Sequence, residues 1–142
     1  MTTALHPRLV IADVDRAIAF YRAAFGCELL ERFVTADGVV VHAAMRLGTS
    51  TFSMAEQVQS WQLLAPPELG GSAVLLHLTV DDPDTVCARV VELGGTVVIP
   101  IEDRNYGKRE GRVRDPFGHL WILSHTLEQL TDEEIQRRLG AS

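Results

Sequence analysis

The stretch Gly111–Leu123, GRVRDPFGHLWIL, decides the fold of this chain. In it a polar segment runs into the sequence Asp-Pro-Phe-Gly, and an apolar segment leaves it. Pro116 presets the backbone angle φ that a turn needs, and Gly118 can adopt the positive φ that closes the turn. Because the side chains alternate in character on both sides, the stretch predicts a β-hairpin.

The size and composition are those of one globular domain. The 142 residues are enough for a sizeable core but not for two large domains. Apolar residues make up 46% of the chain and charged residues 23%, which is typical of globular proteins. The formal net charge of −6 argues against non-specific nucleic-acid binding and is compatible with cationic small molecules. Cys27 and Cys87 are too few for a disulfide framework, so we expect buried thiols.

Nothing in the sequence is typical of a secreted or membrane protein. Residues 1–6 contain no charged segment followed by an apolar run, so we expect no secretory signal. The chain has no run of about 18 apolar residues, so we expect no membrane association. The expected compartment is therefore the cytoplasm.

The first half of the chain predicts one β-α-β-β-β unit. Asp13 is placed to cap a helix and Gly26 to end it. Apolar residues between them recur with the spacing of one helical face, at Ala17, Phe20, Tyr21, Ala24 and Phe25. A strand is expected before this helix, at 5–11, and three strands after it, at 27–34, 39–47 and 50–55.

The second half repeats this order. Asp82 precedes a helix that begins with Pro83, a favoured first position for proline. Its expected buried stripe consists of Val86, Val90 and Leu93, and strands are expected at 73–80 and 96–100. A polar loop at 102–108 then leads into the hairpin, which supplies the last two strands.

The repeat has a consistent register. Gly26 lies thirteen residues after Asp13, and Gly95 lies thirteen residues after Asp82, so the two halves are offset by 69 residues. The predicted fold is therefore α+β, with two tandem βαβββ modules that form paired half-sheets around a cleft. We place module one at about 5–56, a connector at 57–71 and module two at about 72–126, all within a single domain of residues 1–142.

Two segments lie outside the repeat. In the connector, Trp61 either covers a ligand or packs against the edge of the domain. After the second module, Thr131 and Glu134 have the spacing of a capping box, which predicts a short C-terminal helix at about 131–139.

These motifs, in this order, resemble the vicinal oxygen chelate superfamily, which includes glyoxalase I, bleomycin- and fosfomycin-resistance proteins and extradiol dioxygenases. The resemblance rests on the segments DVDRAIAFYRAAFG (13–26), VDD (80–82) and GRVRDPFGHLW (111–121), and it covers the chain from Leu5 to Leu139. The segment Tyr106–Arg109 and the C-terminal tail are similar to the PhnB-like subgroup. The resemblance implies paired βαβββ modules, often as a homodimer.

The resemblance also implies a divalent metal held by His and Glu side chains, and this chain departs from that pattern. His6 matches the first ligand position, but the equivalent position of the second copy is Leu75. The Glu position of the last strand falls on Ile122, and its counterpart falls near Phe52 or Ser53. Because a catalytic ion needs about three protein ligands, we expect no cofactor. An offset metal site that uses His6 and His77 is the alternative.

The alternation of strand side chains indicates which residues line the cleft instead. His6 and Arg8 face it from the first strand, and His77 and Thr79 from the fifth. Arg109 and Arg112 are further candidates, either for ligand contact or for ion pairs with nearby carboxylates. The sequence assigns no catalytic residue.

Three functions remain open. The first is a binding protein that sequesters a small organic molecule in the cleft without a metal, as bleomycin-resistance proteins do. The second is a metal-dependent lyase or dioxygenase of the glyoxalase type with a displaced metal site. The third is a structural or regulatory dimer whose cleft is filled by side chains such as Met45, Phe52 and Met54.

Overall fold

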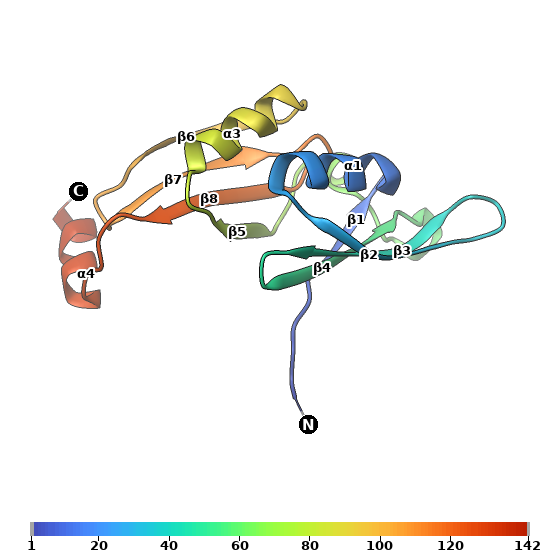
Figure 1. Cartoon of the computed structure of the whole chain (residues 1–142), viewed down its shortest axis with the longest axis horizontal. Coiled ribbons are helices and arrows are strands. Elements are labelled where there is room, and N and C mark those ends of the chain that lie inside the picture. The colour runs from blue at the N-terminus through green and yellow to red at the C-terminus, as the bar shows by residue number, and fades with distance from the viewer. Residues whose placement is uncertain (1, 142) are drawn as a thin grey trace. The chain divides into compact units, whose positions relative to one another are not determined.

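Each half of the chain folds into a four-stranded mixed sheet with a helix on one face, as the computed structural model shows for residues 2–141 (Figure 1). The chain divides into two compact units. The first unit extends to Ser72 and includes Phe117–His119, and the second comprises Ala73–Pro116 and the chain from Leu120 onward. The predicted α+β class, with two βαβββ modules and a short C-terminal helix, is confirmed.

The first unit contains one helix and the sheet β1-β4-β3-β2. Its only parallel strand pair among the described residues is β1 with β4; the other neighbours are antiparallel. The elements are β1 (Arg8–Ile11), α1 (Val14–Phe25), β2 (Glu28–Val34), β3 (Val40–Leu47) and β4 (Ser50–Glu56). The first strand is shorter than predicted. It begins at Arg8, and Leu5 before it is exposed.

Helix α1 begins and ends where its capping residues predict. The Asp13 carboxylate accepts a hydrogen bond from the Arg16 backbone N–H, and Gly26 adopts the left-handed conformation with φ of 73°. Tyr21 is fully buried and lies within 6.1 Å, between ring centroids, of four other aromatic rings, those of Phe20, Phe25, Phe52 and Phe117. This aromatic cluster joins α1 to the sheet beneath it.

The connector holds two short helical turns, η1 (Gln59–Trp61) and α2 (Pro66–Leu69), that the sequence did not predict. Trp61 is 76% exposed. The interpretation that Trp61 packs against the domain edge is therefore wrong.

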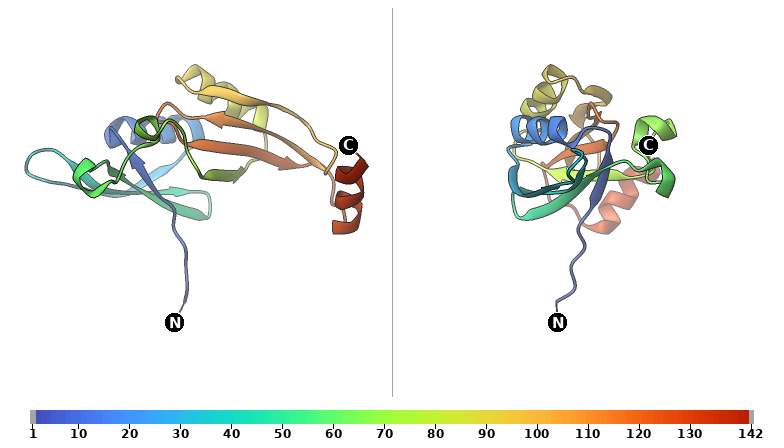
Figure 2. Two further views of the ribbon diagram at one scale, coloured as in Figure 1. Left: turned by 180° about the vertical axis from the view of Figure 1, so that it is seen from behind. Right: turned by 90° about the vertical axis from the view of Figure 1, so that its right-hand side faces the viewer.

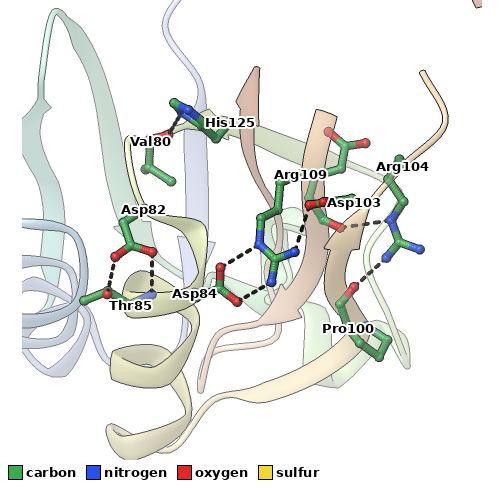
Figure 3. A network of polar contacts seen from close by, with 10 residues as sticks. Val80, Asp82, Asp84, Thr85, Pro100, Asp103, Arg104, Arg109 and His125 are labelled. Carbon is green, nitrogen blue, oxygen red and sulfur yellow. Dashed lines mark hydrogen bonds and ion pairs between the residues drawn. The ribbon is translucent and has the colours of Figure 1, made fainter. Parts of the chain in front are cut away.

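The second unit repeats the topology with the sheet β5-β8-β7-β6. Its elements are β5 (Leu75–Thr79), α3 (Pro83–Glu92), β6 (Thr96–Asp103), β7 (Lys108–Arg114) and β8 (Leu120–Thr126). Asp82 caps α3 by accepting hydrogen bonds from the Thr85 backbone and hydroxyl (Figure 3). Leu93, predicted in the buried stripe of this helix, is exposed because α3 ends at Glu92 and Leu93 forms its C-cap.

The hairpin forms where it was predicted. Strands β7 and β8 pair in antiparallel register, and Gly118 closes the turn with φ of 94°. The Trp121 indole N–H donates to the buried Asp115 carboxylate at 2.9 Å, which fixes the start of the turn. The turn residues Phe117–His119 are grouped with the first unit, where the Phe117 ring lies 5.8 Å from that of Phe20.

Helix α4 (Asp132–Ala141) lies beyond the ends of β7 and β8 in the second unit (Figures 1 and 2). The Thr131 hydroxyl accepts a hydrogen bond from the Glu134 backbone N–H at 3.2 Å, as the capping motif predicts. Within residues 2–141 no helix is long and apolar enough to cross a membrane.

Candidate functional site

The candidate site lies on the open face of the second sheet. Helix α3 covers the face that carries the buried residues Val113, Trp121 and Leu123. Side chains alternate along each strand, so Glu110 and Arg112 of β7 project from the opposite face. Register places Ile122 of β8 beside Arg112 on that face.

A cavity of about 300 Å³ is present on this face. We call it the Arg112 cavity, and its lining residues are Ile99, Arg104, Tyr106, Glu110, Gly111, Arg112 and Ile122. The volume is at the small end of the range for ligand pockets, roughly 300–1,000 Å³, so the cavity suits a small molecule.

Strand register sets the middle of the cavity. Arg112 is the register partner of Ile99 on β6 and of Ile122 on β8. Directly paired residues project from the same face of a sheet. The aliphatic part of the Arg112 side chain therefore lies between the branched side chains of Ile99 and Ile122. The floor of the cavity therefore combines one cation with apolar surface on either side.

Glu110 connects the polar side chains at one end of the cavity. One of its carboxylate oxygens accepts a hydrogen bond from the Tyr106 hydroxyl, and the other accepts one from the Ser124 hydroxyl at 2.7 Å. Both oxygens of Glu110 are thus engaged by neutral donors. This arrangement directs the carboxylate toward Tyr106 and Ser124.

Arg104 is held by backbone carbonyl groups. Its Nε donates to the Glu110 carbonyl at 3.0 Å, and one terminal nitrogen donates to the Pro100 carbonyl at 2.5 Å (Figure 3). The other terminal nitrogen lies 3.3 Å from the Glu102 carboxylate. Arg104 therefore closes the turn between β6 and β7 and leaves few donors for a ligand.

The turn that carries Tyr106 is fixed from outside the cavity. Asn105 donates from its side-chain amide to the Arg138 carbonyl at 3.2 Å, and the Arg138 guanidinium donates to the Asn105 carbonyl at 3.1 Å. Gly107 is close-packed, because a Cβ added there would lie 2.8 Å from the Glu128 carbonyl oxygen. Helix α4 and the segment before it thus hold the Tyr106 side of the cavity in place.

Arg109, which the sequence proposed for ligand contact, lies on the other face. Its guanidinium donates to both carboxylate oxygens of Asp84 on α3, at 2.7 and 2.9 Å, and to Asp103 at 2.9 Å (Figure 3). These ion pairs raise the pKa of Arg109 and lower that of Asp84. The structure does not bring Arg109 together with Arg112, because successive strand residues point to opposite faces.

His77 and Thr79 lie on the open face, on the neighbouring strand β5. His77 is the register partner of Ile122, and Thr79 is the partner of Ser124. Both residues are exposed. The structure thus places His77, Thr79 and Arg112 on one face, although His77 and Thr79 stand beside the Arg112 cavity rather than in its lining.

His6 and Arg8 belong to the first unit. His6 Nδ1 lies 2.6 Å from the Thr51 hydroxyl. Arg8 donates to His42 Nδ1 at 2.8 Å, to the Ser53 hydroxyl at 3.1 Å and to the Val41 carbonyl at 2.7 Å. A guanidinium has no acceptor, so His42 Nδ1 must accept, and His42 Nε2 then carries the proton toward Glu31 at 3.0 Å.

Comparison with known proteins identifies the family. The family model described as the Glyoxalase/Bleomycin resistance protein/Dioxygenase superfamily matches residues 3–123. The chain belongs to this superfamily. The resemblance seen in the sequence is therefore confirmed at this level.

Individual proteins are similar to this chain in sequence or in structure. An uncharacterized protein of Mycobacterium bovis, Mb0911c, is 38% identical over 141 residues, which cover 97% of this chain and 93% of that protein. The Arabidopsis thaliana gene product At5g48480 has a TM-score of 0.69 at 26% identity, and the match covers 87% of this chain and 99% of that one. The PhnB protein of Bacillus cereus shares the fold, with a TM-score of 0.69 at 20% identity over 87% of this chain and 100% of that one.

The metal site that the superfamily resemblance implies does not fit the donors of this chain. Leu75 and Ile122 offer no ligating atom, and Ser53 accepts a hydrogen bond from Arg8. In the part of the chain that the structure describes, no three His, Cys, Asp or Glu side chains gather into a group that could hold a metal ion. His6 alone does not supply the roughly three protein ligands that a catalytic divalent ion requires.

The residues missed in the sequence are those that bond to one another across strands. Tyr106, Glu110 and Ser124 form one side of the Arg112 cavity or its support, and none was proposed as a site residue. The period of two along a strand could have identified Glu110, since it lies two residues before Arg112. The position of Tyr106 depends on the turn at residues 104–107, for which the sequence shows no comparable signal.

We predict that Tyr106 resists ionisation. Burial raises the pKa of Tyr106 to about 12, and the hydrogen bond to the Glu110 carboxylate adds to this shift. The folded state holds the phenolic proton more tightly than the unfolded chain, so this contribution to stability is complete below about pH 10. It is lost as the pH rises through about 12, where the folded phenol ionises.

This titration is measured by following phenolate absorbance as the pH rises, in the native chain and in Tyr106→Phe. The difference between the two curves isolates Tyr106. Glu110→Gln removes the neighbouring charge and should bring the midpoint back toward the ordinary tyrosine value. A midpoint near 10 in the native chain would contradict the described hydrogen bond.

Proposed function

We propose that this protein binds a small organic molecule in the Arg112 cavity of its second unit. The superfamily includes bleomycin-resistance proteins and enzymes, and its name alone does not select between them. The observation that carries the proposal is the lining of the cavity. Ile99 and Ile122 supply apolar surface on either side of the Arg112 cation, while Tyr106 and Glu110 supply polar groups at one end, a combination typical of small-molecule sites.

The third alternative, a cleft filled by side chains, receives no support from the residues that were expected to fill it. Met45, Phe52 and Met54 are buried. Phe52 packs against Tyr21 of α1, with ring centroids 5.5 Å apart, so this side chain belongs to the core beneath the helix. The Arg112 cavity, by contrast, lies on the face of the second sheet that helix α3 does not cover.

A fragment screen by NMR tests the proposed function. We expect neutral or charged one-ring fragments to shift the methyl signals of Ile99 and Ile122 and the ring signals of Tyr106. Ile122→Trp should fill the cavity and abolish these shifts. Leu75→Trp is the matched control, because Leu75 is exposed, at 42%, on the same face and does not line the cavity. Fragments that bind Ile122→Trp as well as the native chain would overturn the proposal.

We further propose that binding uses no resident divalent metal. The positions that would supply ligands carry Leu75 and Ile122, and His6 is hydrogen-bonded to Thr51. A ligand that binds the folded state raises its thermal stability. We therefore expect Zn²⁺, Ni²⁺ or Mn²⁺ to change the melting temperature of the chelator-treated protein by less than about 1 °C. A larger increase that His6→Ala removes would favour the metal-dependent alternative.

A further inference from the structure

We infer that the ligand of the Arg112 cavity is an organic acid whose carboxylate pairs with the Arg112 guanidinium while its apolar body lies on Ile99 and Ile122. This inference rests on the proposed function and names the chemical class of the ligand. It follows from three properties of the cavity: a cation without a counter-ion, a neighbouring carboxylate that is already engaged, and apolar surface on both sides of the cation.

Arg112 is a partly buried arginine without a carboxylate partner in the described part of the second unit. The structure gives it no ion pair within residues 2–141, and its Nε is buried without a hydrogen-bond partner. A buried donor without an acceptor costs free energy unless a partner is supplied. Four other arginines of the same unit are all paired with carboxylates: Arg104, Arg109, Arg137 and Arg138.

Glu110 does not serve as the missing counter-ion. It lies two residues before Arg112 on the same face of β7, but its oxygens accept from the Tyr106 and Ser124 hydroxyls. The raised pKa of Tyr106 keeps that hydroxyl protonated, and therefore available to Glu110, over the physiological range. The cation of Arg112 is left for a group that comes from outside the chain.

The guanidinium geometry of Arg112, the apolar residues beside it and the cavity volume together indicate which kind of anion fits. A guanidinium presents N–H groups in a planar fork that matches the two oxygens of a carboxylate. A carboxylate that binds to Nε and one terminal nitrogen supplies the acceptor that Nε lacks. Ile99 and Ile122 lie on either side of Arg112 in register, so the remainder of the ligand meets apolar surface. A cavity of about 300 Å³ limits the ligand to about the size of a one-ring acid.

The net charge of the whole chain does not favour the binding of organic acids. The formal net charge of −6 repels anions at a distance, so the affinity for an acid has to come from contacts inside the cavity. Removing Arg112 should therefore abolish the preference, whereas removing a nearby exposed arginine should not. This contrast separates a built site from general electrostatic attraction.

The test uses three probes that share a ring and differ in charge: benzoate, benzamide and benzylamine. Each is titrated into the ¹⁵N-labelled full chain, and the Nε–H signal of Arg112, identified by its loss in Arg112→Met, is followed by NMR. We expect benzoate to bind at least about tenfold more tightly than benzamide and to shift the Nε–H signal, because charge-assisted pairs are the stronger ones. Benzylamine should bind least.

Variants separate Arg112 from its surroundings. In Arg112→Met, benzoate should bind no more tightly than benzamide, and in Arg112→Lys the affinity should be intermediate, since a lysine lacks the fork. Arg114→Met is the matched control, because Arg114 is exposed two residues further along the same face of β7. It should leave benzoate affinity within about twofold, as expected for a screened surface charge.

Each outcome decides between the two proposals. Equal affinity of the native chain for benzoate and benzamide, both in the cavity, would overturn the organic-acid inference and leave the proposed function intact. Binding of none of the one-ring probes, including those of the fragment screen, would overturn the proposed function itself. If Arg112→Met does not fold, the comparison of probes in the native chain and in Arg112→Lys decides the inference.

Discussion

Replacing Tyr21 by alanine should lower the free energy of unfolding by about 3–5 kcal/mol, as expected for a large aromatic side chain removed from a core. Tyr21 is fully buried. Its ring lies 5.3 Å from Phe20 and 5.5 Å from Phe52, between ring centroids, so the substitution leaves a cavity between α1 and the sheet. Chemical denaturation followed by circular dichroism measures the change.

Trp61→Ala is the matched control for this substitution. It removes a larger aromatic side chain, but Trp61 is 76% exposed, so its loss should change the unfolding free energy by no more than about 0.5 kcal/mol. A loss below about 1 kcal/mol in Tyr21→Ala would show that the aromatic cluster does not hold the first unit together. A loss of similar size in Trp61→Ala would show that the connector is packed in solution.

The parts of the fold that depend on local chemistry were predictable from the sequence. Asp13 and Asp82 cap the two helices, Gly26 ends the first helix, and Gly118 closes the hairpin, each for a reason that lies within a few residues. The internal repeat then indicated the order of the helix and strands along each half of the chain. The duplicated topology is visible in the sequence because both copies keep the capping residues at the same spacing.

The parts that depend on contacts between distant residues were not predictable. Leu93 has the right spacing for the buried face of α3, but the helix ends one residue earlier and the side chain is exposed. Strand β6 continues to Asp103 because register shifts around Ile99 accommodate extra residues opposite β7. Hydrophobic periodicity does not reveal where such a shift occurs.

The candidate site shows the same division. The period of two placed His77 and Thr79 on one face of their strand, and the strand register of the structure puts Arg112 of β7 on the same face of the second sheet. Arg109 was proposed beside Arg112, yet it pairs with Asp84 of α3 on the other face. The arginines of β7 therefore lie in two environments. Arg109 is paired with carboxylates on the face that α3 covers, whereas Arg112 on the open face has no ion pair among the described residues.

The two modules use the corresponding face of their sheets differently. In the first unit, Arg8 is bound by His42, Ser53 and the Val41 carbonyl, and His42 pairs with Glu31. In the second unit, Arg112 lies between two isoleucines without a carboxylate partner among the described residues. The two units thus hold one arginine that is hydrogen-bonded within its own unit and one whose buried Nε has no acceptor among the described residues.

Replacing Gly111 by alanine should destabilise the second unit by about 3 kcal/mol, the upper part of the range for overpacking. A Cβ added at this position would lie 2.5 Å from the Ile99 carbonyl oxygen and 2.7 Å from the Pro100 carbonyl, so the backbone of β6 has to move. For a chain of this size the melting temperature should fall by roughly 5–10 °C. Ile99 lines the Arg112 cavity, so the same shift should weaken ligand binding.

Gly140→Ala is the matched control for Gly111→Ala, because Gly140 lies in α4 and a Cβ there would meet nothing within 4 Å. Alanine favours helix over glycine, so this variant should be as stable as the native chain or slightly more stable. Amide exchange of the β6 and β7 backbone should accelerate in Gly111→Ala and stay unchanged in Gly140→Ala. Unchanged exchange in both variants would mean that β6 does not pack on Gly111 as closely as the register indicates, and that the wall of the cavity carrying Ile99 is free to move.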